Sequence, residues 1–453
     1  MKKFFGGNST SSMQTEGGWN EDGKSKSVYD IRSETETSSD WKVANDNYHN
    51  LSEDLDLMKN LGLNMYRFQI SWSRVIHDGD GDINSKGLKY YDQLVQGLLD
   101  RNIEPMICLY HFDMPLKLAY EGGFLNKKVV NDFIRYGKII INHFKDKVKY
   151  WITFNEQNLY FQPGATRYAV GVDLGRKETI EDIYQISHNI MYAHACLANY
   201  LHDTSNNKIG GMLAYAATYP ATCNPSDQLL VARFNEFVNN SLLDAFVKGS
   251  YSPAVVSFVK EHHLKLNITD NEIEEIRKLK SDFLAFSYYR TDVIDASKVP
   301  IDVAPNYYLE YGKIRNKYTR SNYWNWNIDP QGFRKVMDDI YYRYRLPVFP
   351  IENGIGLIEH WDGQHTIDDQ IRIDYMRDHI NELKKAQKED GVEVLGYLGW
   401  GLIDILSSSG NMDKRYGVVY VNRSNHDLKD MKRIPKKSFY WLQNVIKTNA
   451  EFI

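Results

Sequence analysis

The sequence has few cysteines, no surplus of one charge and no long apolar run. Its 453 residues include three cysteines (Cys108, Cys196 and Cys223), and 55 Lys and Arg stand against 59 Asp and Glu. Cysteines this far apart form neither a disulfide framework nor a CxxC metal pattern, which fits a reducing compartment. The near balance of charge argues against nucleic acid as a partner. No metal and no organic cofactor is implied.

The sequence also shows neither the pattern of a signal peptide nor that of a membrane span. Two lysines precede only two phenylalanines before Gly6 and Gly7, which is too short for the apolar part of a signal peptide. No stretch approaches the about 20 apolar residues of a membrane span. No Pro-, Gly- or Ser-rich linker divides the chain. We therefore expect a soluble cytoplasmic protein with no membrane partner, folded as one catalytic domain over residues 1–453.

A repeating unit is what the sequence does contain. Eight short, nearly continuous apolar runs alternate with longer segments of helical spacing, such as Leu51–Leu61, Tyr91–Leu99 and Val129–Phe144. Strands that are apolar on both faces are typical of a parallel sheet covered by helices. The runs are Phe4–Ser9, Met65–Ile70, Pro105–Tyr110, Tyr150–Phe154, Ile209–Ala214, Phe283–Ser287, Val348–Ile351 and Val394–Gly399. This count predicts an α/β fold, a single-domain (β/α)₈ TIM barrel. A doubly wound open sheet is the alternative, weakened because no Gly-rich phosphate fingerprint follows the first run.

Polar and aromatic residues stand where the predicted strands end. In such a barrel the active site lies at the C-terminal ends of the strands. Groups there that can bond to sugar hydroxyls, or stack on a sugar ring, are Gln14, Arg67, His111, Asn155, Glu156, Tyr289, Glu352, Asn353 and Trp400.

Two of these residues are carboxylates on opposite sides of the predicted ring. Glu156 ends the fourth strand and Glu352 ends the seventh, each directly after an apolar run. Burial raises a carboxyl pKa, as a general acid requires near neutral pH. Glycoside hydrolysis uses one carboxylic acid on the leaving oxygen and one carboxylate on the other face of the sugar. The pair therefore predicts a glycoside hydrolase.

Several motifs together resemble glycoside hydrolase family 1, the β-glucosidase family, over essentially the whole chain. They are SSMQTEGG, YRFQISWSR, LYHFDMP (Phe112 for the usual Trp), WITFNEQ (Gln157 for Pro) and PIENG (Ile351 for Thr). The resemblance implies a retaining mechanism in which Glu352 is the nucleophile and Glu156 the acid/base. The resemblance also implies that Asn155 hydrogen-bonds to the sugar 2-hydroxyl and that Tyr289 and Arg67 hold Glu352. Gln14, His111 and Trp400 would bind the glycon.

The loop after the eighth strand departs from the β-glucosidases. They carry a Glu-Trp pair there, whereas this chain reads WGLIDILSSSGNMDKRYG. Loss of a carboxylate and gain of hydroxyls and an ammonium suits a phosphate. The loop resembles that of the 6-phospho-β-glucosidase branch, which implies phosphate binding by Ser407, Lys414 and Tyr416. The register leaves Ser408 and Ser409 open as alternatives to Ser407.

The predicted function is therefore hydrolysis of 6-phospho-β-D-glucosides. A 6-phospho-β-galactosidase and an unphosphorylated β-glucosidase are the alternatives, and a non-catalytic sugar-binding barrel is less favoured because both glutamates, Asn155 and Tyr289 are present. The Asn322 to Trp326 segment is a candidate aglycon platform, and Gln157 is expected on the aglycon side. The sequence leaves open the aglycon and the oligomeric state, for which a homodimer or a higher homo-oligomer is the candidate.

Overall fold

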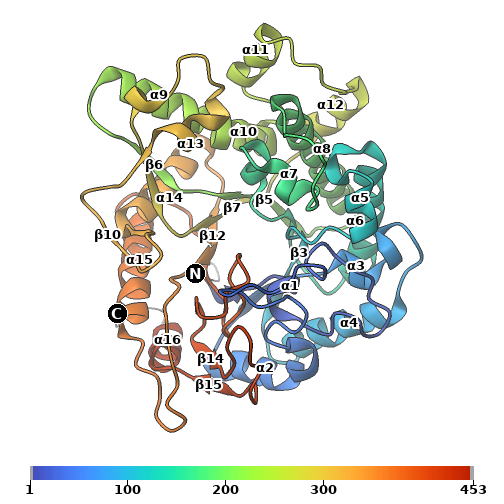
Figure 1. The fold of residues 1–453 in the computed structure, drawn as a ribbon, viewed down its shortest axis with the longest axis vertical. Coiled ribbons are helices and arrows are strands. Elements are labelled where there is room, and N and C mark those ends of the chain that lie inside the picture. Colours follow the sequence, from blue (N-terminus) through green and yellow to red (C-terminus); the bar gives the residue numbers. More distant parts are fainter. Residues whose placement is uncertain (1–3, 449–453) are drawn as a thin grey trace.

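The computed structural model describes residues 4–448, and the outermost residues of the predicted domain, 1–3 and 449–453, lie outside that description. Eight parallel strands form one sheet in the order β12-β7-β5-β4-β3-β2-β1-β13. A parallel bridge between Val348 and Val394 joins its two edges, so the sheet closes into a barrel (Figure 1). The strands are β1 (Phe5–Ser9), β2 (Met65–Gln69), β3 (Glu104–Tyr110), β4 (Tyr150–Phe154), β5 (Lys208–Ala214), β7 (Phe283–Tyr288), β12 (Val348–Asn353) and β13 (Gly396–Trp400). The predicted (β/α)₈ barrel is confirmed.

A ring of helices surrounds the barrel (Figure 1). The main ones are α2 (Asn47–Leu61), α4 (Ser85–Leu99), α6 (Lys127–Phe144), α8 (Ile180–Thr204), α10 (Ser241–Lys248), α14 (Pro330–Tyr344), α15 (Gln370–Lys388) and α16 (Lys437–Lys447). The three predicted helices are present, and each begins before its apolar stripe does. At α6 the Asn126 side chain accepts a hydrogen bond from the Lys128 N–H. Asn126 therefore caps the helix, whose first residue is Lys127.

The barrel interior is packed rather than hollow. Every one of the eight strands contributes a buried apolar side chain to one cluster. Its members are Phe5, Met65, Met106, Cys108, Ile152, Met212, Phe283, Ala285, Phe349, Ile351 and Leu398. A larger apolar layer lies between the outer face of the sheet and the helices. The packed interior closes the barrel below the strand ends, so a ligand can enter only at the mouth.

Short elements that the sequence did not predict are inserted between the barrel units. They are β6 (Ala217–Pro220), β8 (Thr291–Ile294) and β9 (Lys313–Ile314) in one small sheet, and two two-stranded pairs, β10 (Arg320–Ser321) with β11 (Asn327–Ile328) and β14 (Val419–Val421) with β15 (Arg433–Pro435). Further short helices are α1 (Ser12–Thr15), α3 (Trp72–Val75), α5 (Leu116–Tyr120), α7 (Ala165–Ala169), α9 (Pro225–Asn235), α11 (Pro253–Glu261), α12 (Asp270–Arg277) and α13 (Tyr308–Gly312). Most of these follow a barrel strand directly, so they build loops at the mouth.

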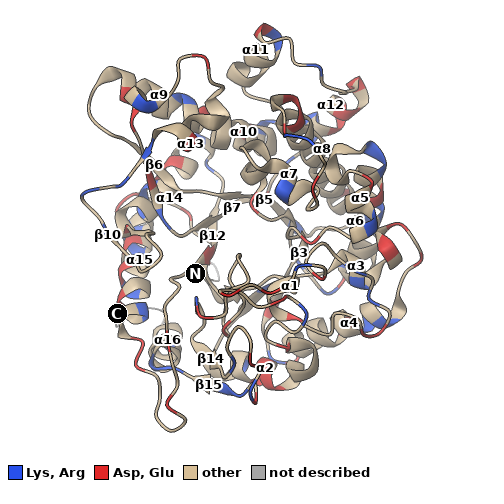
Figure 2. Cartoon of the chain, in the orientation of Figure 1, with Lys and Arg blue, Asp and Glu red and all other residues tan. Residues whose placement is uncertain are grey.

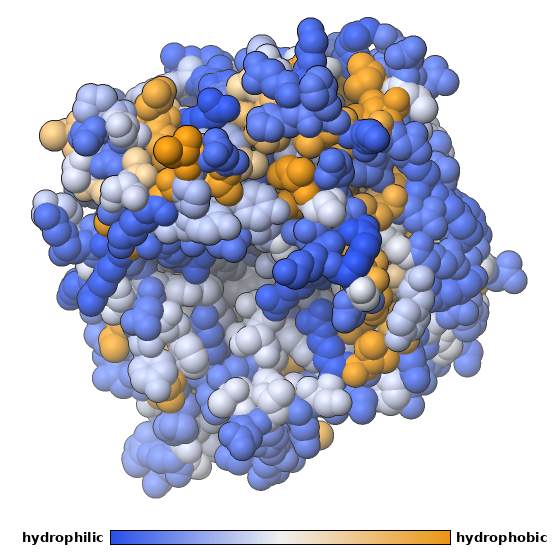
Figure 3. All heavy atoms as spheres, turned by 45° about the horizontal axis from the view of Figure 1, so that its top comes forward, coloured by the Kyte–Doolittle hydropathy of each residue, from blue (hydrophilic) through white to orange (hydrophobic). Residues whose placement is uncertain are grey.

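In the view of Figure 2, Lys and Arg alternate with Asp and Glu along the outer helices. The face drawn in Figure 3 is hollowed near its centre, and apolar side chains gather mainly in the upper part of that view. Within residues 4–448, no helix has the length and apolar character to cross a bilayer. The same residues contain no group of three or more His, Cys, Asp or Glu side chains placed to hold a metal ion.

Candidate active site

A pocket of about 340 Å³ opens at the carboxyl ends of the strands. Eight of the predicted site residues line it: Gln14, His111, Asn155, Glu156, Tyr289, Glu352, Trp400 and Tyr416. They come from the ends of six different strands or the loops after them, although they lie far apart in sequence. Arg67, Ser407 and Lys414 are not among the lining residues; Arg67 contacts Glu352, and Lys414 lies beside Tyr416.

Glu352 lies at the end of β12 and is 2% exposed. The Arg67 Nη1–H donates to Glu352 Oε1, and the Tyr289 hydroxyl donates to Glu352 Oε2 over 3.0 Å. Burial raises the pKa of Glu352 above its ordinary value, while the Arg67 charge and both hydrogen bonds oppose that rise. Arg67 and Tyr289 thus hold the carboxylate from two sides and stabilise its ionised form, which a nucleophile requires, against the effect of burial.

Glu156 lies in a different environment at the end of β4. Its backbone is left-handed (φ 48°), which is uncommon for a residue with a side chain and recurs at functional sites. The Ser287 hydroxyl donates to Glu156 Oε1, and within residues 4–448 no Lys, Arg or His forms an ion pair with it. Burial, together with the negative charge of Glu352, raises the pKa of Glu156 to about 8. Glu156 is therefore the protonated member of the pair at neutral pH.

Asn155 and His111 line the pocket, and each keeps one buried polar atom without a hydrogen-bond partner within residues 4–448. Asn155 Oδ1 accepts from Arg67 Nη2 over 2.7 Å, and its Nδ2 is the unpaired atom. Burial and the Arg67 charge hold the pKa of His111 well below its ordinary range, so the ring is neutral, and its Nδ1 also has no partner. Buried polar atoms are rarely left unpaired, so these atoms point to a hydroxyl-bearing ligand.

Gln14 and Trp400 complete the floor of the pocket. Gln14 Oε1 accepts from the Ser11 hydroxyl over 2.6 Å, and its Nε2 donates to the Leu406 carbonyl over 2.7 Å. Both contacts fix the amide and leave one Nε2 hydrogen for a ligand. The Trp400 ring stacks on His111 with 5.6 Å between ring centroids. An apolar ring face beside polar groups is the surface that a sugar ring needs.

Lys414 is a buried cation beside the pocket. Its Nζ lies 3.6 Å from the ring centroid of Trp326, and Trp324 and Tyr416 are within 5.1 and 5.7 Å. No carboxylate in residues 4–448 pairs with it, and burial, assisted by the charge of Arg290, lowers its pKa to about 8. Gly356 gives its stem room, since a Cβ there would lie 2.6 Å from Lys414 Cγ.

The three serines of the same loop differ in direction. Ser408 is exposed and lines the pocket. Ser407 is 1% exposed, accepts the Asn411 N–H over 3.1 Å and shares a hydrogen bond with the Ser409 hydroxyl. Ser407 therefore shapes the loop in this structure, and Ser408 is the serine that faces the pocket.

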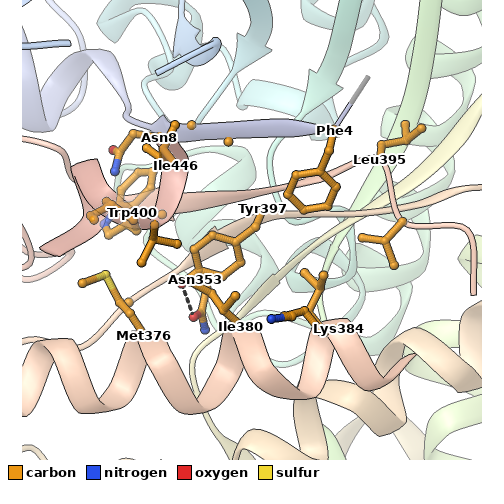
Figure 4. A pocket seen from close by; sticks show the side chains of 18 of the residues that line it. Phe4, Asn8, Asn353, Met376, Ile380, Lys384, Leu395, Tyr397, Trp400 and Ile446 are labelled. Carbon is orange, nitrogen blue, oxygen red and sulfur yellow. Dashed lines mark hydrogen bonds between the residues drawn. The ribbon is translucent and has the colours of Figure 1, made fainter. Parts of the chain in front are cut away.

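A larger hollow, of about 730 Å³, lies outside β1 and β13 and beside α15 and α16 (Figure 4). Trp400 and Tyr416 border both spaces, so these rings form the wall between them. Its lining is mainly apolar and includes neither Glu156 nor Glu352. The Tyr397 hydroxyl donates to Asn353 Oδ1 over 2.7 Å across one side of it. The smaller pocket at the mouth is therefore the candidate active site.

Comparison with known proteins agrees with this geometry. The sequence model of glycosyl hydrolase family 1 matches residues 1–451. The chain belongs to glycosyl hydrolase family 1. It is 37% identical to the aryl-phospho-beta-D-glucosidase BglC of Bacillus subtilis, covering 99% of this chain and 98% of the relative. It is 33% identical to a 6-phospho-beta-glucosidase of Clostridium longisporum, with 99% and 98% covered. The family 1 b-glucosidase of Thermotoga maritima superimposes with a TM-score of 0.87 at 30% identity, covering 98% of this chain and 97% of that one.

Two expectations about this family 1 site change with the structure. Gln157 is 2% exposed, lies outside the pocket lining and approaches Thr153 Oγ1 at 3.5 Å, so it does not form the aglycon side. From the Asn322 to Trp326 segment, Trp326 does line the pocket, but it and Trp324 also surround Lys414. The sequence analysis did not predict the contact of Ser287 with Glu156, and no local signal could have shown it.

Proposed function

We propose that this family 1 enzyme hydrolyses 6-phospho-β-D-glucosides with retention of configuration, releasing glucose 6-phosphate and the aglycon. Lys414 carries the phosphate part of this proposal. A lysine that is mostly buried, caged by three aromatic rings and without a carboxylate partner has an unfavourable charge unless an anion binds. A sugar phosphate in the pocket supplies that anion.

The 6-phosphate would be bound by Lys414, the Tyr416 hydroxyl and the serine run. By spacing, Ser407 matches the serine of the phospho-glucosidase branch, while Ser408 is the residue that lines the pocket. We therefore assign Ser408 the direct approach to the substrate and Ser407 the support of the loop. A charge-assisted hydrogen bond to phosphate is about twice as strong as a neutral one.

The chemistry follows from the difference between the two carboxyls. Glu352 Oε attacks the anomeric carbon and the bond to the aglycon oxygen breaks, while Glu156 donates its proton to that oxygen. Glu156, now ionised, takes a proton from water, and the hydroxide oxygen displaces Glu352 from the anomeric carbon. Two inversions give net retention, which expects the carboxyls about 5–5.5 Å apart.

The remaining residues bind and orient the sugar. The free Asn155 Nδ2–H would donate to the 2-hydroxyl, and Arg67 holds the amide in that orientation. His111 and Gln14 would bind other glycon hydroxyls, and Trp400 would lie under the ring. The small Ser408 at the place where phospho-galactosidases tend to carry Trp favours glucosides. Because phosphorylated disaccharides form during uptake, we place the enzyme in the cytoplasm.

Three chromogenic substrates test the proposal: p-nitrophenyl β-D-glucoside 6-phosphate, its galactoside counterpart and the free glucoside. We expect strong turnover of the first only. Fast turnover of the free glucoside would contradict the phosphate site, and preference for the galactoside would reverse the glycon assignment. No turnover of any of the three would support a binding barrel without catalysis.

The two serines are separated by a paired measurement. Ser408→Ala should raise KM for the phosphorylated glucoside while leaving the thermal midpoint unchanged. Ser407→Ala should lower the thermal midpoint, because the Asn411 N–H loses its acceptor. The reverse pattern would return the phosphate contact to Ser407.

A further inference from the structure

Ser287 on β7 is the only hydrogen-bond partner of the Glu156 carboxyl within residues 4–448. It is 2% exposed, so solvent does not compete for its hydroxyl. Glu352, by contrast, is held by both Arg67 and Tyr289. The acid/base group thus depends on one neutral contact for its orientation.

The position of Ser287 in the barrel places it beside both catalytic carboxyls. In the strand register Ser287 is opposite Glu352 of β12 on one side and Ala214 of β5 on the other. The register shift in β12 between Pro350 and Glu352 sets the first of these pairs. A single backbone position therefore fixes the height of the nucleophile in the barrel and, through its side chain, the direction of the acid/base.

We propose that Ser287 is a positioning residue that orients the Glu156 carboxyl toward the oxygen of the leaving group. The proposal rests on the proposed function, which gives Glu156 the acid/base role. A hydroxyl suits this task because it has one proton and two lone pairs. It can donate to Oε1 both when the carboxyl is ionised and when the proton is on the other oxygen, Oε2, so the contact lasts through both steps of the reaction.

A leaving-group series tests the proposal, using aryl β-D-glucoside 6-phosphates and cellobiose 6-phosphate. Ser287→Ala should lower kcat/KM about tenfold for cellobiose 6-phosphate, whose leaving group needs the proton. The 2,4-dinitrophenyl substrate should change little, because its phenolate leaves without protonation. Ser287→Thr, which keeps the hydroxyl, should restore most of the loss.

The pH profile is a second readout that a merely structural role would not move. The hydroxyl stabilises the ionised form of Glu156, so its removal raises the pKa of that carboxyl further. The alkaline limb of kcat/KM should therefore move upward in Ser287→Ala, by up to about one unit. Ser241→Ala is the matched control: Ser241 is also buried and bonded to oxygen, but on α10 to the Phe237 carbonyl.

An equal loss on all leaving groups with an unmoved alkaline limb would overturn the proposal, as would wild-type behaviour of Ser287→Ala. If Ser287→Ala does not fold, Ser287→Cys, whose S–H is a weak donor, is measured in the same way. Glu156→Gln separates this inference from the proposed function. If Glu156→Gln treats good and poor leaving groups as the wild type does, the acid/base assignment itself is refuted. If Glu156→Gln slows the poor leaving groups selectively but Ser287→Ala does not, only the role of Ser287 is refuted.

Discussion

The molecule buries charge in two contrasting regions. Behind the pocket, an ion network pairs every charge with an opposite one; it consists of Glu359, Asp369 and Asp404 with Arg372, Arg415 and Lys436. At the pocket and its wall, Glu156 and Lys414 are also buried, yet neither forms an ion pair within residues 4–448. Lys414 of the pocket wall and Arg415 of the network are neighbours in the segment after β13, so the difference is one of role rather than place.

The ion network holds the segment after β13 from behind. Arg415 Nη1 lies 3.0 Å from Asp404 Oδ2, and Lys436 Nζ lies 2.9 Å from Asp404 Oδ1. Arg415 also exchanges two backbone hydrogen bonds with Leu357, which ties this loop to the one after the nucleophile. Neighbouring residues of one segment thus face opposite ways: Arg415 into the ion network, Lys414 toward the Trp326 ring. Compensated charge holds the loop, and uncompensated charge is what the proposed binding and chemistry use.

Removing the nucleophile should have the largest effect. Glu352→Gly should lower kcat/KM for the phosphorylated glucoside by roughly 10⁴-fold or more, because the covalent route is lost. Azide should partly rescue the rate. It should convert the β-glucoside into an α-glycosyl azide, which NMR would detect. Activity that survives without azide would place the nucleophile elsewhere.

Breaking the ion network should cost stability rather than chemistry. Burial raises the pKa of Asp404, but Lys436 and Arg415 outweigh it and hold the pKa below its ordinary value. Asp404→Asn leaves those cations underpaired and should lower the free energy of unfolding by about 3–5 kcal/mol. Asp374→Asn, which breaks an exposed pair with Arg377, should change it by less than about 1 kcal/mol in a denaturant titration. Equal effects would erase the contrast.

Removing the unpaired cation should affect binding and spare stability. Lys414→Met keeps the apolar stem, loses the ammonium and should raise KM for the 6-phosphate substrate by about 10- to 100-fold, for a loss of about 1.5–3 kcal/mol. The thermal midpoint should hold or rise, because a buried unpaired charge is gone. Lys317→Met, at an exposed lysine 5.0 Å from the Tyr318 ring, is the control. An unchanged KM would remove Lys414 from the phosphate site.

The pH profile should show the smallest but most specific effect. Glu156 must be protonated for the first step, so kcat/KM should fall as pH rises through about 8. Glu352 must be ionised, and burial raises its pKa, so the acid limb should lie above the ordinary carboxyl value. Glu156→Gln should remove the contribution of Glu156 to the alkaline limb. A limb that remains near pH 8 is expected from Lys414 and should be absent when Lys414→Met is added; a limb that persists in the double variant would belong to another group.

The fold could be predicted because the local pattern decides it. Each of the eight apolar runs coincides with a barrel strand to within about two residues, since strands covered on both faces require continuous apolar sequence. The same holds for the residues that end those strands, such as Glu156 and Glu352, whose position follows from the strand itself.

The rest of the site depends on contacts between distant segments. Trp326 meets Lys414 across 88 positions, and Ser287 meets Glu156 across 131. Neither pair leaves a periodic signal in the sequence. The sequence therefore predicts only an aglycon platform for the Asn322 to Trp326 segment and not its contact with Lys414. The serine run shows a further limit: in a loop, neighbouring side chains have no fixed alternation, and only the fold shows that Ser408 faces the pocket while Ser407 does not.

The lowered pKa of Lys414 couples binding to the protons of the medium. Because this pKa is about 8, a share of the molecules carries Lys414 in its neutral form near pH 8, whereas the phosphate dianion of the proposed substrate would bind to the ammonium form. Complex formation should therefore draw protons from the buffer. In titration calorimetry with the Glu352→Gly variant, the observed heat should change with the ionisation enthalpy of the buffer at pH 8 and lose that part of its buffer dependence in a Lys414→Met background.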